Sequence, residues 1–193
     1  MEDKRLPDVL KKLARGPQII TLKDAAIISA FTGMSPGDIV VDAGSGSGFL
    51  AIYMGNLVRP SGKVISYERR PDFAKLAQGN VNKAGLEGYV TIKEKDIYEG
   101  IDEHDVDVIT LDLPEPWNAV EHSVRALKDR GFLVSYVPTV EQVRRFASQC
   151  EKSGLKHVKT VECCVREMVL HERGTRPQIK GIMHTGYITF VRK

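Results

Sequence analysis

The 193-residue sequence has little of what marks secreted or membrane proteins. Its three cysteines form no C-x-x-C pair, which argues against a disulfide scaffold and favours a reducing cytoplasm. The longest uncharged stretch, 43–58, contains four glycines and is shorter than the roughly 20 apolar residues of a membrane span. The charged first twelve residues are not typical of a secretory signal. We therefore expect a cytoplasmic globular protein with no membrane partner.

The adjacent cysteines Cys163 and Cys164 lie in a run of alternating apolar residues. Free cysteine is among the residue types most often found buried, so we expect two buried thiols here. The spacing of the cysteines gives no support to a zinc site, and we expect no metal.

The net charge is only +3, but charge is unevenly distributed along the chain. Segment 144–193 has eleven Lys or Arg against four Glu, and segment 94–115 has nine acids against one Lys. A basic C-terminal region favours an anionic partner such as a nucleic acid. A well-mixed, solvated surface is the alternative interpretation.

Short β-branched segments alternate with helical segments along most of the chain. Strands are expected at 38–42, 63–68, 89–94, 106–111, 132–137, 157–170 and 183–191, and helices at 49–57, 71–84, 118–128 and 139–153. This alternation predicts an α/β, Rossmann-like fold with a seven-stranded, mostly parallel sheet and helices on both faces. Two further helices, at 7–14 and 23–32, precede the sheet. We therefore predict a helical appendage over 1–38 and the main domain over 39–193.

A glycine-rich turn follows the first predicted strand. Gly44, Gly46 and Gly48 alternate with Ser45 and Ser47, and the turn opens the next helix. Glycines at these positions let a ligand approach the backbone closely, which favours a nucleotide-like ligand. The spacing is G-x-G-x-G and differs from the G-x-G-x-x-G of dinucleotide-binding proteins. A tight turn without a ligand is the alternative.

Acidic residues stand at the ends of four successive strands: Asp42, Glu68, Asp96 and Asp112. Glu68 is placed to accept two hydrogen bonds from a ribose diol, and Asp96 to accept one from an adenine amino group. Asp42 is placed to hold the loop or a cationic group. Each acid alone is equally well explained as a helix cap or a solvated charge, but four together indicate a site.

This arrangement resembles the class I S-adenosylmethionine-dependent methyltransferases, over about 39–137. The resemblance implies S-adenosylmethionine as cofactor. The residues that match the superfamily pattern are Asp42, Gly44, Gly46, Gly48, Glu68 and Asp96. Further candidate cofactor contacts are Leu22, Ser45, Ser47, Arg69, Ile97 and Asp112.

The loop after the fourth strand reads Asp112-Leu-Pro-Glu-Pro-Trp117. Its prolines stiffen it, Asp112 offers a carboxylate, and Trp117 offers a flat ring on which an adenine can stack. The N1 nitrogen of adenine has a free in-plane lone pair, so methylating it requires mainly positioning. The product is a cation that a nearby carboxylate stabilises. The alternative is a rigid loop whose tryptophan fills core space.

Four segments together resemble the tRNA (adenine-N1)-methyltransferases that modify the T-loop. They are 111–117, 67–72, 18–24, and 176–177 followed by 184–187, and the resemblance extends over 15–193. It implies a tRNA (adenine-N1)-methyltransferase that is a homotetramer, with tRNA as substrate and Asp112 as the catalytic carboxylate. Candidate substrate contacts are Trp117, Arg176, His184 and Thr185.

The sequence departs from that family in two places. The family usually has Tyr-Pro where this chain has Thr21-Leu22, so an aromatic that helps hold the base is missing. The family also has a β-rich N-terminal domain that helps bind tRNA, and this sequence begins almost where the catalytic domain does. Basic residues near the start are expected to compensate in part: Lys4, Arg5, Lys11, Lys12 and Arg15.

Two other functions remain open at this point. One is a small-molecule methyltransferase similar to the precorrin methyltransferases, which also have a Gly-Pro and a Thr-x-Lys-acid segment, here Gly16-Pro17 and 21–24. The other is a non-catalytic RNA-binding subunit. The basic stretch 173–181 is expected to form a mobile loop near the substrate, or else an ordinary hairpin turn.

Overall fold

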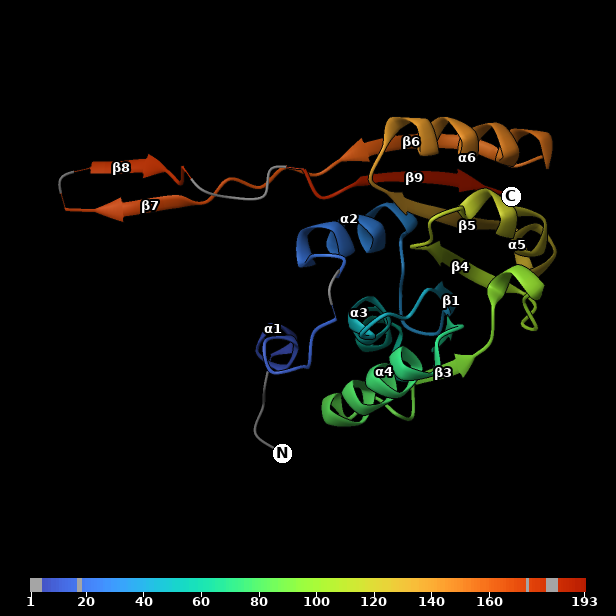
Figure 1. The fold of residues 1–193 in the computed structure, drawn as a ribbon, viewed down its shortest axis with the longest axis horizontal. Coiled ribbons are helices and arrows are strands. Elements are labelled where there is room, and N and C mark those ends of the chain that lie inside the picture. Colours follow the sequence, from blue (N-terminus) through green and yellow to red (C-terminus); the bar gives the residue numbers. More distant parts are fainter. Residues whose placement is uncertain (1–4, 17–18, 173, 180–183) are drawn as a thin grey trace.

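The computed structural model describes residues 5–16, 19–172, 174–179 and 184–193. Its α-helices are α1 (Leu6–Leu10), α2 (Leu22–Thr32), α3 (Phe49–Val58), α4 (Pro71–Ala84), α5 (Val120–Ala126) and α6 (Val140–Lys152), with 3-10 helices η1 (Ile97–Glu99) and η2 (Pro116–Ala119). Its strands are β1 (Ile39–Ala43), β2 (Lys63–Glu68), β3 (Val90–Glu94), β4 (Val106–Leu111), β5 (Leu127–Val137), β6 (Lys156–Glu162), β7 (Met168–His171), β8 (Gly174–Pro177) and β9 (Tyr187–Arg192). Figure 1 shows their arrangement.

Seven strands form one sheet in the order β3-β2-β1-β4-β5-β9-β6. Strands β1 to β5 pair in parallel, and β9 is antiparallel to both of its neighbours. The predicted α/β fold with a mostly parallel sheet is confirmed. The strand order reverses beside β1, which is where open sheets of this kind bind ligands, outside the carboxyl ends of the strands.

Successive side chains along the strands alternate between two separate core clusters, one on each face of the sheet. Val40 of β1 and Val108 of β4 pack with Ile52 of α3. The following residues, Val41 and Ile109, pack in the other cluster with the α5 and α6 side chains. This alternation follows from the two-residue repeat of a β-strand. Helices therefore cover both faces, and the acids at the strand ends lie at the edge between them.

The N-terminal helices pack against one of these clusters. Leu10, Leu13, Ile20 and Ile28 are buried in the same cluster as residues of β1 and α3. The chain before β1 therefore shares a core with the sheet. The division into two units at residue 38 stays a prediction.

The structure corrects several predicted elements. The first helix, expected at 7–14, ends at Leu10. The helix expected at 118–128 is shorter, because Leu127 already begins β5, where it pairs with Val106 of β4. The strand expected at 157–170 ends at Glu162, and the chain leaves the sheet before β7 begins. The last strand begins at Tyr187, and residue 183 lies outside the described residues.

The prediction of two buried thiols at Cys163 and Cys164 is wrong. Cys164 is exposed and Cys163 is only partly buried, whereas Cys150 on α6 is buried. The cysteine pair follows the end of β6, so it lies in the connection that leaves the sheet and has no core to pack into.

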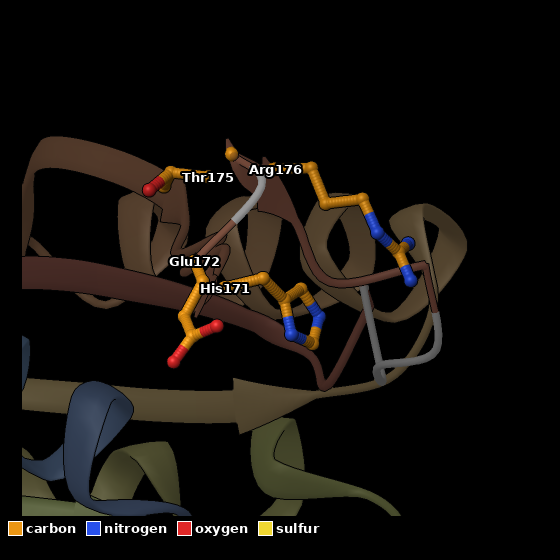
Figure 2. A pocket seen from close by; sticks show the side chains of 5 residues that line it. His171, Glu172, Thr175 and Arg176 are labelled. Atoms are coloured by element: carbon orange, nitrogen blue, oxygen red, sulfur yellow. The ribbon is translucent and has the colours of Figure 1, made fainter.

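Strands β7 and β8 pair as a separate antiparallel hairpin that projects from the body of the molecule (Figure 1). Within the described part of 173–181, Gly174–Pro177 form one strand of this hairpin, and a mobile loop near the substrate stays a prediction. An open hollow of about 750 Å³ is lined by His171, Glu172, Gly174, Thr175 and Arg176. Figure 2 shows Thr175 on one side, and Arg176 extending on the same side as the His171 ring. We assign no function to this hollow.

Candidate active site

The glycine-rich turn is fastened to the end of β2 by backbone groups. The Ser45 N–H donates to the carbonyl of Tyr67 at 3.0 Å, and the Gly46 N–H donates to Glu68 Oε2 at 2.9 Å. Gly46 and Gly48 have φ angles of +52° and +80°, which side chains other than glycine rarely adopt. The predicted turn therefore exists, and its shape depends on these glycines.

Asp42 is buried directly beneath the turn. Its two carboxylate oxygens accept hydrogen bonds from Ser66 Oγ at 2.6 Å and Thr110 Oγ1 at 2.7 Å. Burial raises the pKa of Asp42 to about 6, against the effect of these two hydrogen bonds, and the charge of Glu68 raises it further. Ser66 also bonds to Ser45 of the turn at 2.7 Å. Asp42 therefore holds the turn from below.

Asp112 follows β4 and pairs with the end of β1 through its backbone. Its N–H donates to the carbonyl of Ala43 at 2.5 Å, and its own carbonyl accepts from the Gly44 N–H at 3.3 Å. Its side chain keeps contact with solvent, while protein atoms around it remove part of its hydration. That loss of hydration and the charge of Asp42 raise its pKa to about 7. Within the described residues, its carboxylate accepts no hydrogen bond.

Glu68 and Asp96 are each held in place while keeping acceptor capacity. Glu68 is 6% exposed, and its second oxygen accepts from the Arg70 N–H at 3.1 Å. Each oxygen of Glu68 thus accepts one backbone hydrogen bond and retains a lone pair for a diol. Asp96 caps η1 by accepting from the Tyr98 N–H at 3.0 Å, and Arg69 lies 3.6 Å from its other oxygen.

The space in front of the glycine-rich turn is open enough at Gly46 for S-adenosylmethionine to approach the backbone. A Cβ atom added at Gly46 would meet nothing within 4 Å, whereas one at Gly44 would lie 3.5 Å from Glu68 Oε2. The buried Ser47 Oγ has no hydrogen-bond partner among the described residues. An open, glycine-lined surface bordered by Glu68 and Asp112 fits a nucleoside that carries a positive charge.

Two other predicted cofactor contacts lie on elements outside the turn. Leu22 is 44% exposed at the start of α2, and Ile97 is buried in the first turn of η1. Their assignment to the cofactor stays a prediction.

Thr185 takes part in a polar cluster that joins segments far apart in the sequence. Asp24, fully buried, accepts hydrogen bonds from Thr21 Oγ1 at 2.8 Å and Thr185 Oγ1 at 3.0 Å, and pairs with Lys23 Nζ at 2.8 Å. Lys23 also donates to Thr185 and to the carbonyl of Cys163, both at 2.6 Å. We call Lys23, Asp24 and Thr185 the basal clamp, because they hold together the segment that leads into β7 and the segment that follows β8.

Tyr136 contacts the basal clamp and lies close enough to Asp112 for the charge of Asp112 to affect its pKa. It hydrogen-bonds to Thr185 and Asp24, and burial together with the charges of Asp24 and Asp112 raises its pKa to about 12. The sequence analysis did not single out Tyr136. Its position could have indicated a role. Tyr136 stands one residue before the end of the fifth strand, and the neighbouring fourth strand is followed by Asp112.

His184 is anchored at the same end of the sheet. One ring nitrogen lies 2.5 Å from Glu162 Oε1 and the other 2.9 Å from the carbonyl of Pro138. Both partners are acceptors, so both ring nitrogens donate only in the imidazolium form. The Glu162 hydrogen bond, followed by that of Pro138, raises the pKa of His184.

Unlike Thr185 and His184, the residues Trp117 and Arg176 form no hydrogen bond to an acidic side chain in the described part of the chain. The guanidinium of Arg145 on α6 lies 4.0 Å from the centre of the Trp117 ring, so one face of that ring is covered. Arg176 is exposed on the projecting hairpin. A substrate contact by either residue stays a prediction.

The described residues contain no group of three metal-ligand side chains, and no described helix has the length and apolar character needed to cross a membrane.

Comparison with known proteins gives the family. Residues 10–176 match the family described as tRNA methyltransferase complex GCD14 subunit. The chain is 39% identical, over 96% of its length and 75% of the relative's, to a Methanocaldococcus jannaschii protein named tRNA (adenine(57)-N(1)/adenine(58)-N(1))-methyltransferase TrmI. It is 31% identical, over 89% of its length and 68% of the relative's, to the Thermus thermophilus tRNA (adenine(58)-N(1))-methyltransferase TrmI.

A solved Thermotoga maritima structure, described as an S-adenosylmethionine-dependent O-methyltransferase, superposes with a TM-score of 0.91. It is 36% identical and covers 98% of this chain and 71% of its own. The fold, the glycine-rich turn and these matches agree, and the chain belongs to the tRNA methyltransferase family of the GCD14 subunit.

Proposed function

We propose that this chain transfers the methyl group of S-adenosylmethionine to N1 of an adenine in the T-loop of tRNA. The observation that carries the proposal is the Asp112 carboxylate, which faces solvent beside the glycine-rich turn and has no protein hydrogen-bond partner among the described residues. An acceptor left free at the end of β4 is available to a substrate. Family membership supports tRNA as that substrate.

The cofactor supplies an electrophilic methyl group whose positive charge passes to the base when the methyl is transferred. Gly44 to Gly48 would lie against it, and Glu68 and Asp96 would accept its ribose and adenine hydrogen bonds. Arg69, Ile97 and Leu22 would border the same surface.

Asp112 would accept a hydrogen bond from the N6 amine of the target adenine. This contact turns N1 toward the cofactor, and attack by N1 needs no proton removed because its lone pair is free. The product base is a cation, and the ionised Asp112 stabilises it as it forms. Because ionisation matters, kcat/KM for the cofactor should rise with pH through about 7, the pKa of Asp112 in the cofactor-free protein.

The other predicted substrate contacts lie in different parts of the fold. Arg145 covers one face of Trp117, so a base would have to stack on the other face. Thr185 and His184 lie at the base of the hairpin, near Tyr136. Contact with Arg176 requires that the tRNA extend along the hairpin.

Variants of Asp112 test the proposal. Asp112→Asn and Asp112→Ala should still bind the cofactor, more weakly because one negative charge near it is lost, while methyl transfer to bulk tRNA at saturating cofactor falls about 100-fold or more. The matched control is Glu115→Gln in the same loop, since Glu115 is exposed and, among the described residues, its side chain hydrogen-bonds only to nearby Asn118. Nucleoside analysis of the tRNA should identify 1-methyladenosine.

Three results would contradict the proposal. One is full turnover by Asp112→Ala, and another is a methylated nucleoside other than 1-methyladenosine. The third is methylation of a corrinoid precursor but not of tRNA, which would establish the small-molecule alternative. A cofactor titration that shows no affinity would instead support the non-catalytic subunit.

The β7–β8 hairpin supports a further proposal, that copies of this chain associate through it, with the homotetramer expected from the family as the assembly. A two-stranded ribbon alone is marginally stable in water. Met168 and Leu170 are 53% and 78% exposed on it, and Ile179 beyond it is 83% exposed. Leu170→Glu should lower the molecular mass measured by light scattering, and an unchanged mass would refute this contact. We place the protein in the cytoplasm on its cysteine content.

A further inference from the structure

One face of α4 lies against the glycine-rich turn. Phe73, Ala77 and Asn80 are spaced four and three residues apart, so they share one face of the helix. A Cβ added at Gly48 would lie 3.3 Å from Ala77 Cβ, and one added at Gly16 would lie 3.0 Å from Phe73 Cε1. The same helix face therefore contacts both the turn and the chain that precedes α2.

Asn80 joins these two segments with a single amide group. It is 1% exposed, and its Nδ2 donates to the carbonyls of Ser47 and Ala14, each at 2.8 Å. Its Oδ1 accepts from the Ala14 N–H at 3.1 Å. Three backbone groups from segments more than 30 residues apart in sequence thus depend on one side chain.

The segment 14–16, which we call the N-terminal strap, lies directly beside the turn. A Cβ at Gly16 would lie 3.9 Å from Ser47 Cβ. The guanidinium of Arg15 lies 5.8 Å from the ring of Phe49, the first residue of α3. The strap therefore borders the surface on which the cofactor is expected.

We propose that Asn80 is a positioning residue that couples docking of the N-terminal strap to cofactor binding. The inference rests on the proposed function, because it concerns the cofactor of that reaction. A bound cofactor needs the turn backbone held in one conformation, and Asn80 holds the Ser47 carbonyl only while it is itself held between strap and turn. Ordering one segment lowers the entropic cost of ordering the other, and the coupling is reciprocal.

Two variants and a control separate this role from general stability. Asn80→Ala removes all three hydrogen bonds, and Asn80→Asp keeps an acceptor for the Ala14 N–H but has no donor for either carbonyl. Both should weaken binding of S-adenosylmethionine, measured by calorimetry, by about tenfold or more. Asn82→Ala is the control, because Asn82 is exposed on the same helix and its side chain bonds only to Gln78. Its affinity should stay within about twofold of the wild type.

Limited trypsin digestion measures the reciprocal effect without any turnover. The exposed Lys11, Lys12 and Arg15 flank or lie in the strap. S-adenosylmethionine should slow cleavage at these residues in the wild type, and should give little protection in either Asn80 variant. At saturating cofactor, kcat should stay near the wild-type value while KM for the cofactor rises.

The outcomes distinguish this proposal from the function on which it rests. If the wild type binds no S-adenosylmethionine, the proposed function fails. If the wild type binds and methylates tRNA, but the cofactor does not protect the strap, the coupling is refuted. The coupling is also refuted if Asn80→Asp melts at a lower temperature with unchanged affinity, because Asn80 is then only structural.

Discussion

Replacing Asp42 by Asn should stabilise the cofactor-free protein and weaken cofactor binding. Asp42 is 2% exposed, and burial raises its pKa from 3.8 to about 6. Asn has the same shape, so one amide atom can still accept from Thr110 Oγ1. The other can donate to Ser66 Oγ, which is free to turn its own hydrogen toward Ser45 Oγ. The change therefore removes the charge and keeps the hydrogen bonds.

The size of the effect follows from the two pKa values. A carboxyl whose pKa is higher in the folded state binds more protons folded than unfolded, so the free energy of unfolding falls as pH rises from about 4 to 6. The full cost of ionised Asp42 is about 3 kcal/mol above that range, since each pKa unit corresponds to about 1.4 kcal/mol. About half of it is already present at pH 5. The advantage of Asp42→Asn over the wild type should therefore grow by roughly 1.4 kcal/mol between pH 5 and pH 8.

Urea denaturation of the cofactor-free wild type and of Asp42→Asn at both pH values measures this difference. Calorimetry at pH 8 should show weaker binding of S-adenosylmethionine to the variant, because one negative charge near a cationic ligand is lost. A stability difference that is the same at pH 5 and pH 8 would refute the reasoning. So would a variant less stable than the wild type at pH 8, since the amide would then disrupt the hydrogen bonds that we expect it to keep.

Three further changes have defined outcomes. Lys23→Met leaves the buried carboxylate of Asp24 without its cation. It should lower the free energy of unfolding, measured in urea, by about 3 kcal/mol. An unchanged free energy would show that the other hydrogen-bond donors to Asp24 are enough to keep its carboxylate stable. Gly186→Ala places a Cβ 2.6 Å from the ring of Tyr136 and should cost about 1–3 kcal/mol in the same assay, and an unchanged midpoint would contradict the close packing. The raised pKa of His184 means that its imidazolium stabilises the fold below pH 6.5, and that this contribution is lost as pH rises through the raised value. His184→Gln should therefore lower the melting temperature near pH 6 but not at pH 9, and an equal loss at both would contradict the charged form.

The first strand, the turn and the helix after it were predictable because their signals are local. The apolar strand, the acid Asp42 and the alternating glycines follow one another, and each restricts its own part of the backbone. The cap at Thr139 was predictable for the same reason, and the Gln142 N–H does donate to Thr139 Oγ1 at 3.3 Å. The Gln142 side chain, however, also donates to the carbonyl of Pro114 at 3.0 Å, which fastens the Asp112 loop. Sequence spacing gave no sign of that contact.

What could not be predicted depends on contacts between distant segments. Asp24 and Thr185 are 161 residues apart, and nothing near either residue indicates that they meet. The end of β6 was missed because alternating apolar residues continue past Glu162, and a two-residue repeat does not show where a strand leaves its sheet. Asn80 had a local signal, a polar residue between the apolar Ala77 and Val81 on a helix, but its partners were not apparent.

The negative charges of Asp42 and Asp112 destabilise the cofactor-free protein, and the same charges favour the proposed reaction. Asp42 lies near the end of β1 and Asp112 directly follows the adjacent parallel strand β4, and the charge of Asp42 makes Asp112 harder to ionise. A positive charge at this place lowers that cost, whether it is on the cofactor before methyl transfer or on the base afterwards. Ionised acids thus favour both the bound cofactor and the methylated product, whereas an apolar site would favour neither. The affinity for S-adenosylmethionine should then increase from pH 5 to pH 8 in the wild type, and an affinity independent of pH would place the positive charge away from these two carboxylates.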